Sequence, residues 1–263
     1  MEAEVRTSAG SDKIRLWQRY ADTFYGRDHA ASPPRYSQRY GYDREQMLRD
    51  LGDDVHPVSH MLHTDLNILS PLIFFQNKFG KLKISPVLAE NLHTTAQLHD
   101  IGECSHPLIE QVIGDLVGDV HYEDKNAEHE AKERLIRHYL YDQIFDDVPR
   151  RRLEAMDAIL DDPKSVEGHI FNTVERTGYY LTAMRAGELA LKLLQDETAA
   201  QDHRSIMLGR LAWRVSWNHH DELTDRAEDF PYIEKLLEKH DATFRQIKAQ
   251  IPEYDPNAEA AAA

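Results

Sequence analysis

Residues 87–103 have the sequence VLAENLHTTAQLHDIGE, and both the predicted core and the predicted site depend on them. Apolar residues such as Leu92 recur along this stretch at helical spacing, which predicts a core helix. His99 and Asp100 follow at the C-terminal end of that helix. A neutral imidazole beside a carboxylate offers two adjacent ligands for a divalent metal, and Glu103 lies one helical turn after His99. The combination indicates a metal-dependent catalytic site.

A group of histidines precedes this helix in the chain. Pro57 suits the first turn of a helix, and His56, His60 and His63 follow one another at intervals of four and three residues on one helical face. An apolar series continues from His63 through residues 66–75. The spacing predicts a second core helix that carries further imidazole groups.

The segment from His99 to Glu103 resembles the motif of the HD-domain metal-dependent phosphohydrolases. It is most similar to the 5'-deoxynucleotidase branch, whose motif reads His-Asp-x-x-Glu. The resemblance extends to the upstream His63 and to an acidic helix over residues 125–135, and it covers roughly residues 55–190. It implies an all-α fold, the HD-domain helical bundle.

The resemblance also implies a set of metal ligands. His63, His99 and Asp100 match the first three positions, with His60 as the competing candidate for the first of them. The expected cofactor is one divalent metal ion, and this mixed nitrogen and oxygen ligand set does not distinguish among Mn, Co, Ni, Fe, Zn and Mg.

The last ligand of the family is an aspartate on a later helix, and here the matching position holds Glu175. A glutamate can ligate the same metals, yet its extra methylene moves the carboxylate outward by roughly 1.5 Å at covalent bond lengths. Asp157 and Asp161, which lie earlier in the chain, are the alternatives for this ligand.

Glu103 is the predicted catalytic residue, because it lies near the ligands without being counted among them. It would accept a proton from the attacking water or donate one to the leaving oxygen, and the sequence leaves both roles open. The predicted function is the hydrolysis of a nucleoside monophosphate or a related small phosphate ester, with the metal as Lewis acid and template.

Two other classes of function stay open. HD-fold di-iron oxygenases use O₂ and bind a second metal, for which further histidines are available at His106, His121, His129 and His138. A non-catalytic nucleotide-binding module would bind its ligand without any metal.

Composition excludes several classes of protein. The 31 basic residues are outnumbered by 46 acidic ones, which argues against a surface for polymeric nucleic acid. Cys104 is the single cysteine, so an intramolecular disulfide and a multi-cysteine zinc site are both excluded. The longest apolar run, residues 66–75, is too short to span a bilayer. We therefore expect a cytoplasmic protein, and the resemblance adds the expectation of a homodimer.

The chain of 263 residues is long enough for one domain with extensions. No internal repeat and no alternating strand pattern is visible, which predicts an all-α fold. We expect an N-terminal helical extension over residues 1–54, an HD-type metal-binding domain over 55–195, and a C-terminal helical cap over 196–263 packed on the same domain. The predicted helices outside 87–103 are residues 14–25, 40–51, 57–76, 107–120, 127–145, 153–160, 168–195, 206–217 and 232–251.

Overall fold

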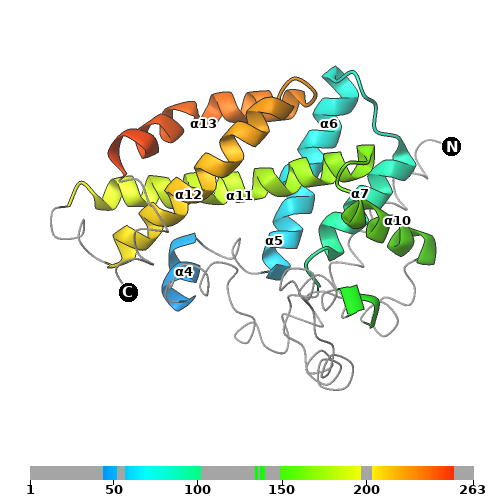
Figure 1. Cartoon of the computed structure of the whole chain (residues 1–263), viewed down its shortest axis with the longest axis horizontal. Helices are drawn as coiled ribbons and strands as arrows, with labels where there is room; N and C mark the ends of the chain where they lie inside the picture. The colour runs from blue at the N-terminus through cyan, green and yellow to red at the C-terminus, as the bar shows by residue number, and fades with distance from the viewer. Residues whose placement is uncertain are drawn as a thin grey trace.

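The computed structural model describes residues 44–51, 57–101, 134–135, 137–139, 149–196 and 203–251. Helices account for most of these residues and none of them forms a β-strand, so the predicted all-α class is confirmed for this part of the chain. The helices predicted over 14–25 and 107–120 lie outside the described residues, as do Glu103 and Cys104. Figure 1 shows how the described helices are arranged.

Helix α11 (Val166–Leu193) runs through the middle of the molecule and contacts most of the other helices. Its N-terminus is fixed by Ser165, whose side chain accepts a hydrogen bond from the Gly168 backbone N–H at 3.0 Å. The predicted bounds were 168–195, so both ends were predicted to within two residues. Because other helices cover it from several sides, α11 buries residues around much of its circumference, from Ile170 to Leu191.

Helices α12 (His203–Arg226) and α13 (Pro231–Gln250) pack along α11 and against each other. Gly187 permits the close approach of α13, since a Cβ at this position would collide with the side chain of Ile247. The buried apolar residues of all three helices belong to one core that also includes α6 and α7. The prediction of 206–217 for α12 was too short, because the helix continues through a polar stretch to the buried Leu223.

A single continuous helical rod crosses α11 near one end (Figure 1). It consists of α5 (Pro57–His63), the π-helical segment η3 (Thr64–Leu69) and α6 (Ser70–Phe79). The wide turn is closed at Ser70, whose backbone N–H and hydroxyl both donate to the carbonyl of Asp65, the hydroxyl at 3.0 Å. Such π segments are rare and often mark functional sites.

Helices α7 (Pro86–Leu98) and α10 (Arg150–Asp161) pack against each other beside this rod. Ser85 caps α7 by accepting the Leu88 N–H at 3.2 Å, and Pro86 occupies the first turn. The helix predicted over 87–103 ends earlier than expected, because His99 and Asp100 lie in a turn.

Helix α4 (Arg44–Leu51) is tied to α12 by Arg204, whose guanidinium donates to the buried carboxylate of Asp50.

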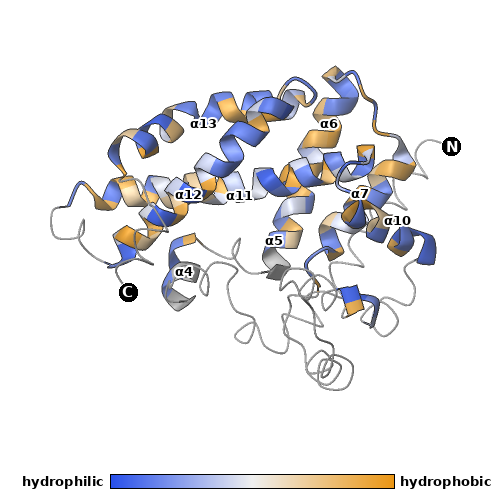
Figure 2. Ribbon diagram, viewed as in Figure 1, coloured by the Kyte–Doolittle hydropathy of each residue, from blue (hydrophilic) through white to orange (hydrophobic). Residues whose placement is uncertain are grey.

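Polar residues cover the outside of this arrangement. Figure 2 shows hydrophilic residues over much of the visible surface of α12 and α13, as expected for helices that turn their apolar side inward. No helix within the described ranges has both the length and the apolar character needed to cross a lipid bilayer.

One buried phenol gives a prediction about stability. Tyr180 on α11 is fully buried, and its hydroxyl has no hydrogen-bond partner among the described residues. An unpaired buried polar group costs about 1–3 kcal/mol, so we expect Tyr180→Phe to raise the free energy of unfolding at pH 7 by roughly 1 kcal/mol. Urea unfolding of both proteins measures this difference. A loss of stability of similar size would show that the hydroxyl is paired.

The same phenol predicts a pH dependence. Burial, and secondarily the negative charge of Asp241, raise the pKa of Tyr180 above its ordinary value. The unfolded phenol ionises near pH 10 while the folded one resists ionisation. The contribution of Tyr180 to the free energy of unfolding is therefore fully present below about pH 10 and decreases above it. Phenylalanine does not ionise, so Tyr180→Phe avoids this loss, and its stability advantage over the wild type should widen between pH 9 and pH 11.

Candidate metal centre

Three potential metal ligands converge where α5 meets the end of α7. His60 comes from α5, and His99 and Asp100 come from the turn that follows α7. One potential ligand atom from each lies within 4.8 Å of the others. His99 Nε2 is 3.3 Å and His60 Nε2 is 4.0 Å from Asp100 Oδ2. All three residues are buried, with at most 9% of their surface exposed.

The geometry and chemistry of this group fit a divalent metal ion. When each ligand atom lies about 2.1 Å from an ion, two ligand atoms can be at most about 4.2 Å apart. Both distances to Asp100 fall within that limit, and the three atoms as a group lie within 4.8 Å of one another. Two imidazole nitrogens and one carboxylate oxygen form a donor set that suits Zn²⁺, Fe²⁺, Mn²⁺, Co²⁺ and Ni²⁺. Three protein ligands would also leave coordination positions open for substrate.

The ring of His99 is oriented by the last turn of α7, which precedes it. Its Nδ1 lies 3.1 Å from the Ala96 carbonyl, which can only accept a hydrogen bond, so Nδ1 carries the proton of the neutral ring. Nε2 therefore holds the lone pair and faces Asp100. Phe171 of α11 contacts the ring edge-on, with the centroids 5.2 Å apart. A hydrogen bond from the second ring nitrogen to a backbone carbonyl, here that of Ala96, is typical of metal-binding histidines.

His60 is held against α11 by close packing. A Cβ on Gly178 would lie only 3.3 Å from His60 Cε1, so the absence of a side chain there gives the imidazole its space. The hydroxyl of Thr64 lies 3.4 Å from His60 Nε2. The ring is also stacked on Tyr179, with centroids 6.1 Å apart and an interplanar angle of 14°.

Tyr179 extends this stack to α12. Its other neighbour is His219, with centroids 5.3 Å apart, and its hydroxyl donates to Glu175 Oε1 at 3.3 Å. Burial, followed by the positive charge of Arg176, lowers the pKa of His219, although Glu222 acts in the opposite direction. The phenol of Tyr179 and the imidazole of His219 form an ordered layer behind His60.

A second buried polar cluster fixes α7 against η3. The carboxylate of Asp65 is buried, and it is bound by His93 Nδ1 through one oxygen and by Gln97 Nε2 through the other. His93 and Gln97 lie one turn apart on α7, so both contacts lock the same face of that helix. A buried carboxylate needs such partners. The cluster therefore positions the helix that leads into the turn of His99 and Asp100.

The structure does not bring His63 into this group. Its ring is partly exposed, and its Nδ1 accepts a hydrogen bond from Asn67 Nδ2 at 3.0 Å. The predicted apolar series also departs from expectation, since Leu66 is 51% and Phe74 57% exposed. The wide turn of η3 shifts the helical phase, so the buried side of the rod follows His60, Thr64, Asp65, Ile68, Leu69, Leu72 and Gln76.

The remaining predicted ligands lie elsewhere or outside the described residues. Glu175 is on α11, half-buried, and contacts Tyr179 rather than belonging to the group of three. Asp157 binds His138 Nε2 at 2.8 Å, and Asp161 pairs with Arg134. The ligand role of Glu175 and the catalytic role of Glu103 stay predictions.

Sequence patterns alone did not identify the residues that support the site. Tyr179 lies one turn after Glu175, and this spacing is a signal that could have pointed to their contact. Asp65, His93 and Gln97 come from two helices, so only their packing reveals them as a cluster.

Comparisons of the chain with protein-family models, with curated proteins and with solved structures give no match.

Proposed function

We propose that this protein is a metal-dependent phosphohydrolase that acts on a nucleoside monophosphate or a related small phosphate ester. The observation that carries the proposal is the buried group of His60, His99 and Asp100, whose potential ligand atoms lie within 4.8 Å of one another. The proposal differs from the sequence-based expectation in two ligands, because it assigns the first position to His60 in place of His63 and does not count Glu175 in the group.

Each residue of the proposed site has a distinct task. His60 and His99 provide neutral nitrogen ligands, and Asp100 provides one negative charge that partly balances a divalent cation. A cation held there would supply Lewis-acid assistance to phosphate ester hydrolysis. The layer of Tyr179 and His219 keeps His60 in position from behind.

Glu103 is proposed to transfer the proton. Its role rests on its place in the sequence, three residues after Asp100 in the His-Asp-x-x-Glu pattern. A carboxylate near the attacking water or the leaving nucleoside oxygen can accept or donate the proton that hydrolysis requires. The choice of a nucleoside monophosphate as substrate rests on the resemblance of this pattern to the 5'-deoxynucleotidases.

Metal removal tests the proposed function. We expect dialysis against EDTA to abolish phosphate release from nucleoside 5'-monophosphates, and we expect at least one of Mn²⁺, Co²⁺, Ni²⁺, Fe²⁺, Zn²⁺ or Mg²⁺ to restore it. Phosphate release should be measured over nucleoside mono-, di- and triphosphates with each metal added back.

Other outcomes would refute the proposal and identify its alternatives. Two iron atoms per chain with O₂-dependent turnover and no phosphate release would indicate an oxygenase. Nucleotide binding that needs no metal and leads to no turnover would indicate a binding module. Phosphate release that is unaffected by EDTA would contradict the metal requirement.

A further inference from the structure

A cavity of about 320 Å³ lies where α6, the N-terminus of α11 and the turn between α12 and α13 meet. We call it the α11 pocket. It shares no lining residue with the metal centre. Gln76 of the pocket and His60 of the metal centre are sixteen residues apart on one continuous rod, about 24 Å at the rise of an α-helix. Pockets of this volume hold small organic molecules.

One end of the α11 pocket attracts negative charge. Lys164 and Ser165 line the pocket immediately before the first turn of α11, and Lys81 lines it from the loop after α6. The N-terminus of a 28-residue helix carries partial positive charge and is suited to phosphate groups. Asp162 and Ser165 already accept backbone N–H groups of this turn, so the two ammonium groups would provide much of the binding.

A buried side chain in the pocket lacks one hydrogen-bond partner. Gln76 is 1% exposed, and its Nε2 donates to the Asp229 carbonyl at 3.1 Å, which fixes the orientation of the amide. Its Oε1 has no hydrogen-bond partner among the described residues. Gly80 leaves room for the amide, since a Cβ there would collide with it. A buried acceptor of this kind favours a ligand that brings an N–H or O–H donor.

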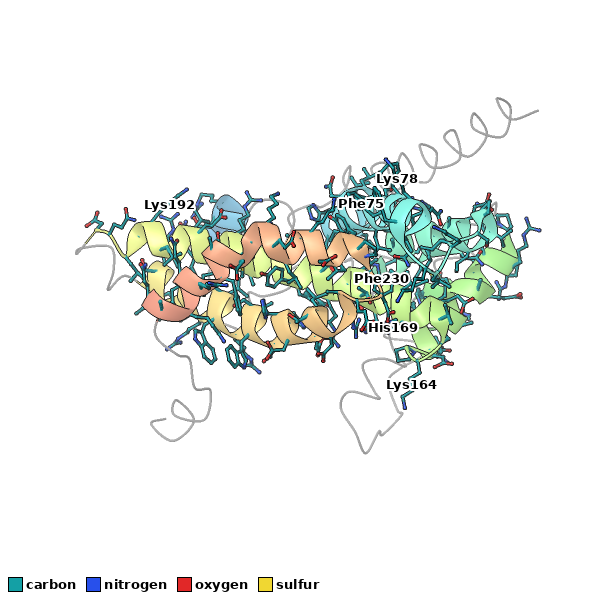
Figure 3. All side chains as sticks on the ribbon, turned by 90° about the horizontal axis from the view of Figure 1, so that it is seen from above. Phe75, Lys78, Lys164, His169, Lys192 and Phe230 are labelled. Carbon is teal, nitrogen blue, oxygen red and sulfur yellow. The ribbon has the colours of Figure 1, made fainter. Side chains whose placement is uncertain are left out.

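The wall of the pocket is aromatic and apolar. Figure 3 shows His169 and Phe230 next to each other and Lys164 at the outer edge of the molecule. The two rings are 5.7 Å apart between centroids. Burial, followed by the positive charge of Arg226, lowers the pKa of His169, while Asp229, which also lines the pocket, acts in the opposite direction. Leu82, Val166 and Ile170 complete a surface against which a planar group can pack.

We infer that the α11 pocket binds a small phosphate monoester whose organic part carries a hydrogen-bond donor. The phosphate lies at the N-terminus of α11 between Lys81 and Lys164. The donor reaches Gln76 Oε1, and the planar part of the ligand packs on His169 and Phe230. This site is separate from the proposed catalytic site and does not depend on a metal.

Calorimetric titration of the EDTA-treated protein tests this inference with two probes. Inorganic phosphate contains only the anion, while adenosine 5'-monophosphate adds a planar base with an amino donor. We expect both probes to bind and adenosine 5'-monophosphate to bind at least about tenfold more tightly, since a donor to a buried acceptor and an apolar contact are added. Failure of both probes to bind would overturn the inference.

Two variants and one control locate the binding. Lys81→Ala/Lys164→Ala should weaken both probes at least about tenfold, because the charges that hold the phosphate are removed. Gln76→Met should weaken adenosine 5'-monophosphate and leave inorganic phosphate unchanged. Lys78→Ala/Lys235→Ala makes the same charge change at exposed lysines that do not line the pocket, and it should have little effect. An equal loss of affinity in the control variant would indicate nonspecific attraction and refute the site. Unchanged binding of adenosine 5'-monophosphate by the Gln76→Met variant would refute the role of the donor.

Discussion

The His60→Gln variant is expected to lose its bound divalent metal and to lose phosphate-release activity by at least about 100-fold. Mutation of a residue that only hydrogen-bonds to a metal ligand typically lowers metal affinity about 10- to 100-fold, so removal of the ligand itself should lower it more. Glutamine fills much of the space of the imidazole beside Gly178, which limits damage to packing. Metal analysis, activity and helical circular dichroism of the purified variant give the three readouts.

His63→Gln is the matched control for this prediction. The two histidines are three residues apart on one rod, yet only His60 approaches Asp100. We expect His63→Gln to retain metal and to change activity less than about threefold, a barrier change under roughly 1 kcal/mol. If His63→Gln lost the metal and His60→Gln kept it, the ligand would be His63, as the resemblance alone implies.

The Glu103→Gln variant is expected to separate metal binding from chemistry. General acid–base assistance contributes typically about 10²- to 10⁴-fold, so turnover of a nucleoside monophosphate should fall by at least the lower figure. The metal content should stay near that of the wild type, because Glu103 is not assigned as a ligand. Steady-state kinetics at saturating metal, together with metal analysis, measure both quantities.

Two results would contradict the role of Glu103. Turnover near that of the wild type in the metal-loaded variant would show that its carboxylate is a solvated group. Loss of the metal would mark Glu103 as a ligand and would favour a site with two metals.

Helix positions followed closely from the sequence where apolar spacing and end signals agree. Pro163 and the capping Ser165 mark the start of α11, and the first turn of α13 contains Pro231. Both helices begin and end within two residues of the prediction. For α12 the polar stretch from Asn218 to Glu222 hid the continuation of the helix, which packing along α11 maintains.

The candidate site was predicted only in part, and η3 gives the reason. His99 and Asp100 are adjacent in sequence, so their proximity needed no knowledge of packing. His63 was preferred to His60 because the resemblance places the first ligand there and an apolar series follows it. The hydrogen bonds of Ser70 to the Asp65 carbonyl instead close a wider turn, which places His60 and Thr64 on the buried side.

The supporting contacts of the site join segments that are distant in sequence. Tyr179 of α11 is stacked between His60 of α5 and His219 of α12, and no spacing pattern within one segment predicts such a layer. Gly178 similarly has a role only because α5 packs against it. Such contacts depend on the crossing of helices, which apolar periodicity does not specify.

The central claim is that one divalent ion binds to His60, His99 and Asp100. The most direct test is an anomalous difference map from crystals of the protein reconstituted with the metal that best restores activity, recorded at the absorption edge of that metal. We predict a strong peak about 2.0–2.3 Å from a ring nitrogen of His60, from His99 Nε2 and from a carboxylate oxygen of Asp100. A peak bound by His63 without His60, or the absence of a peak beside His99 and Asp100, would contradict the claim.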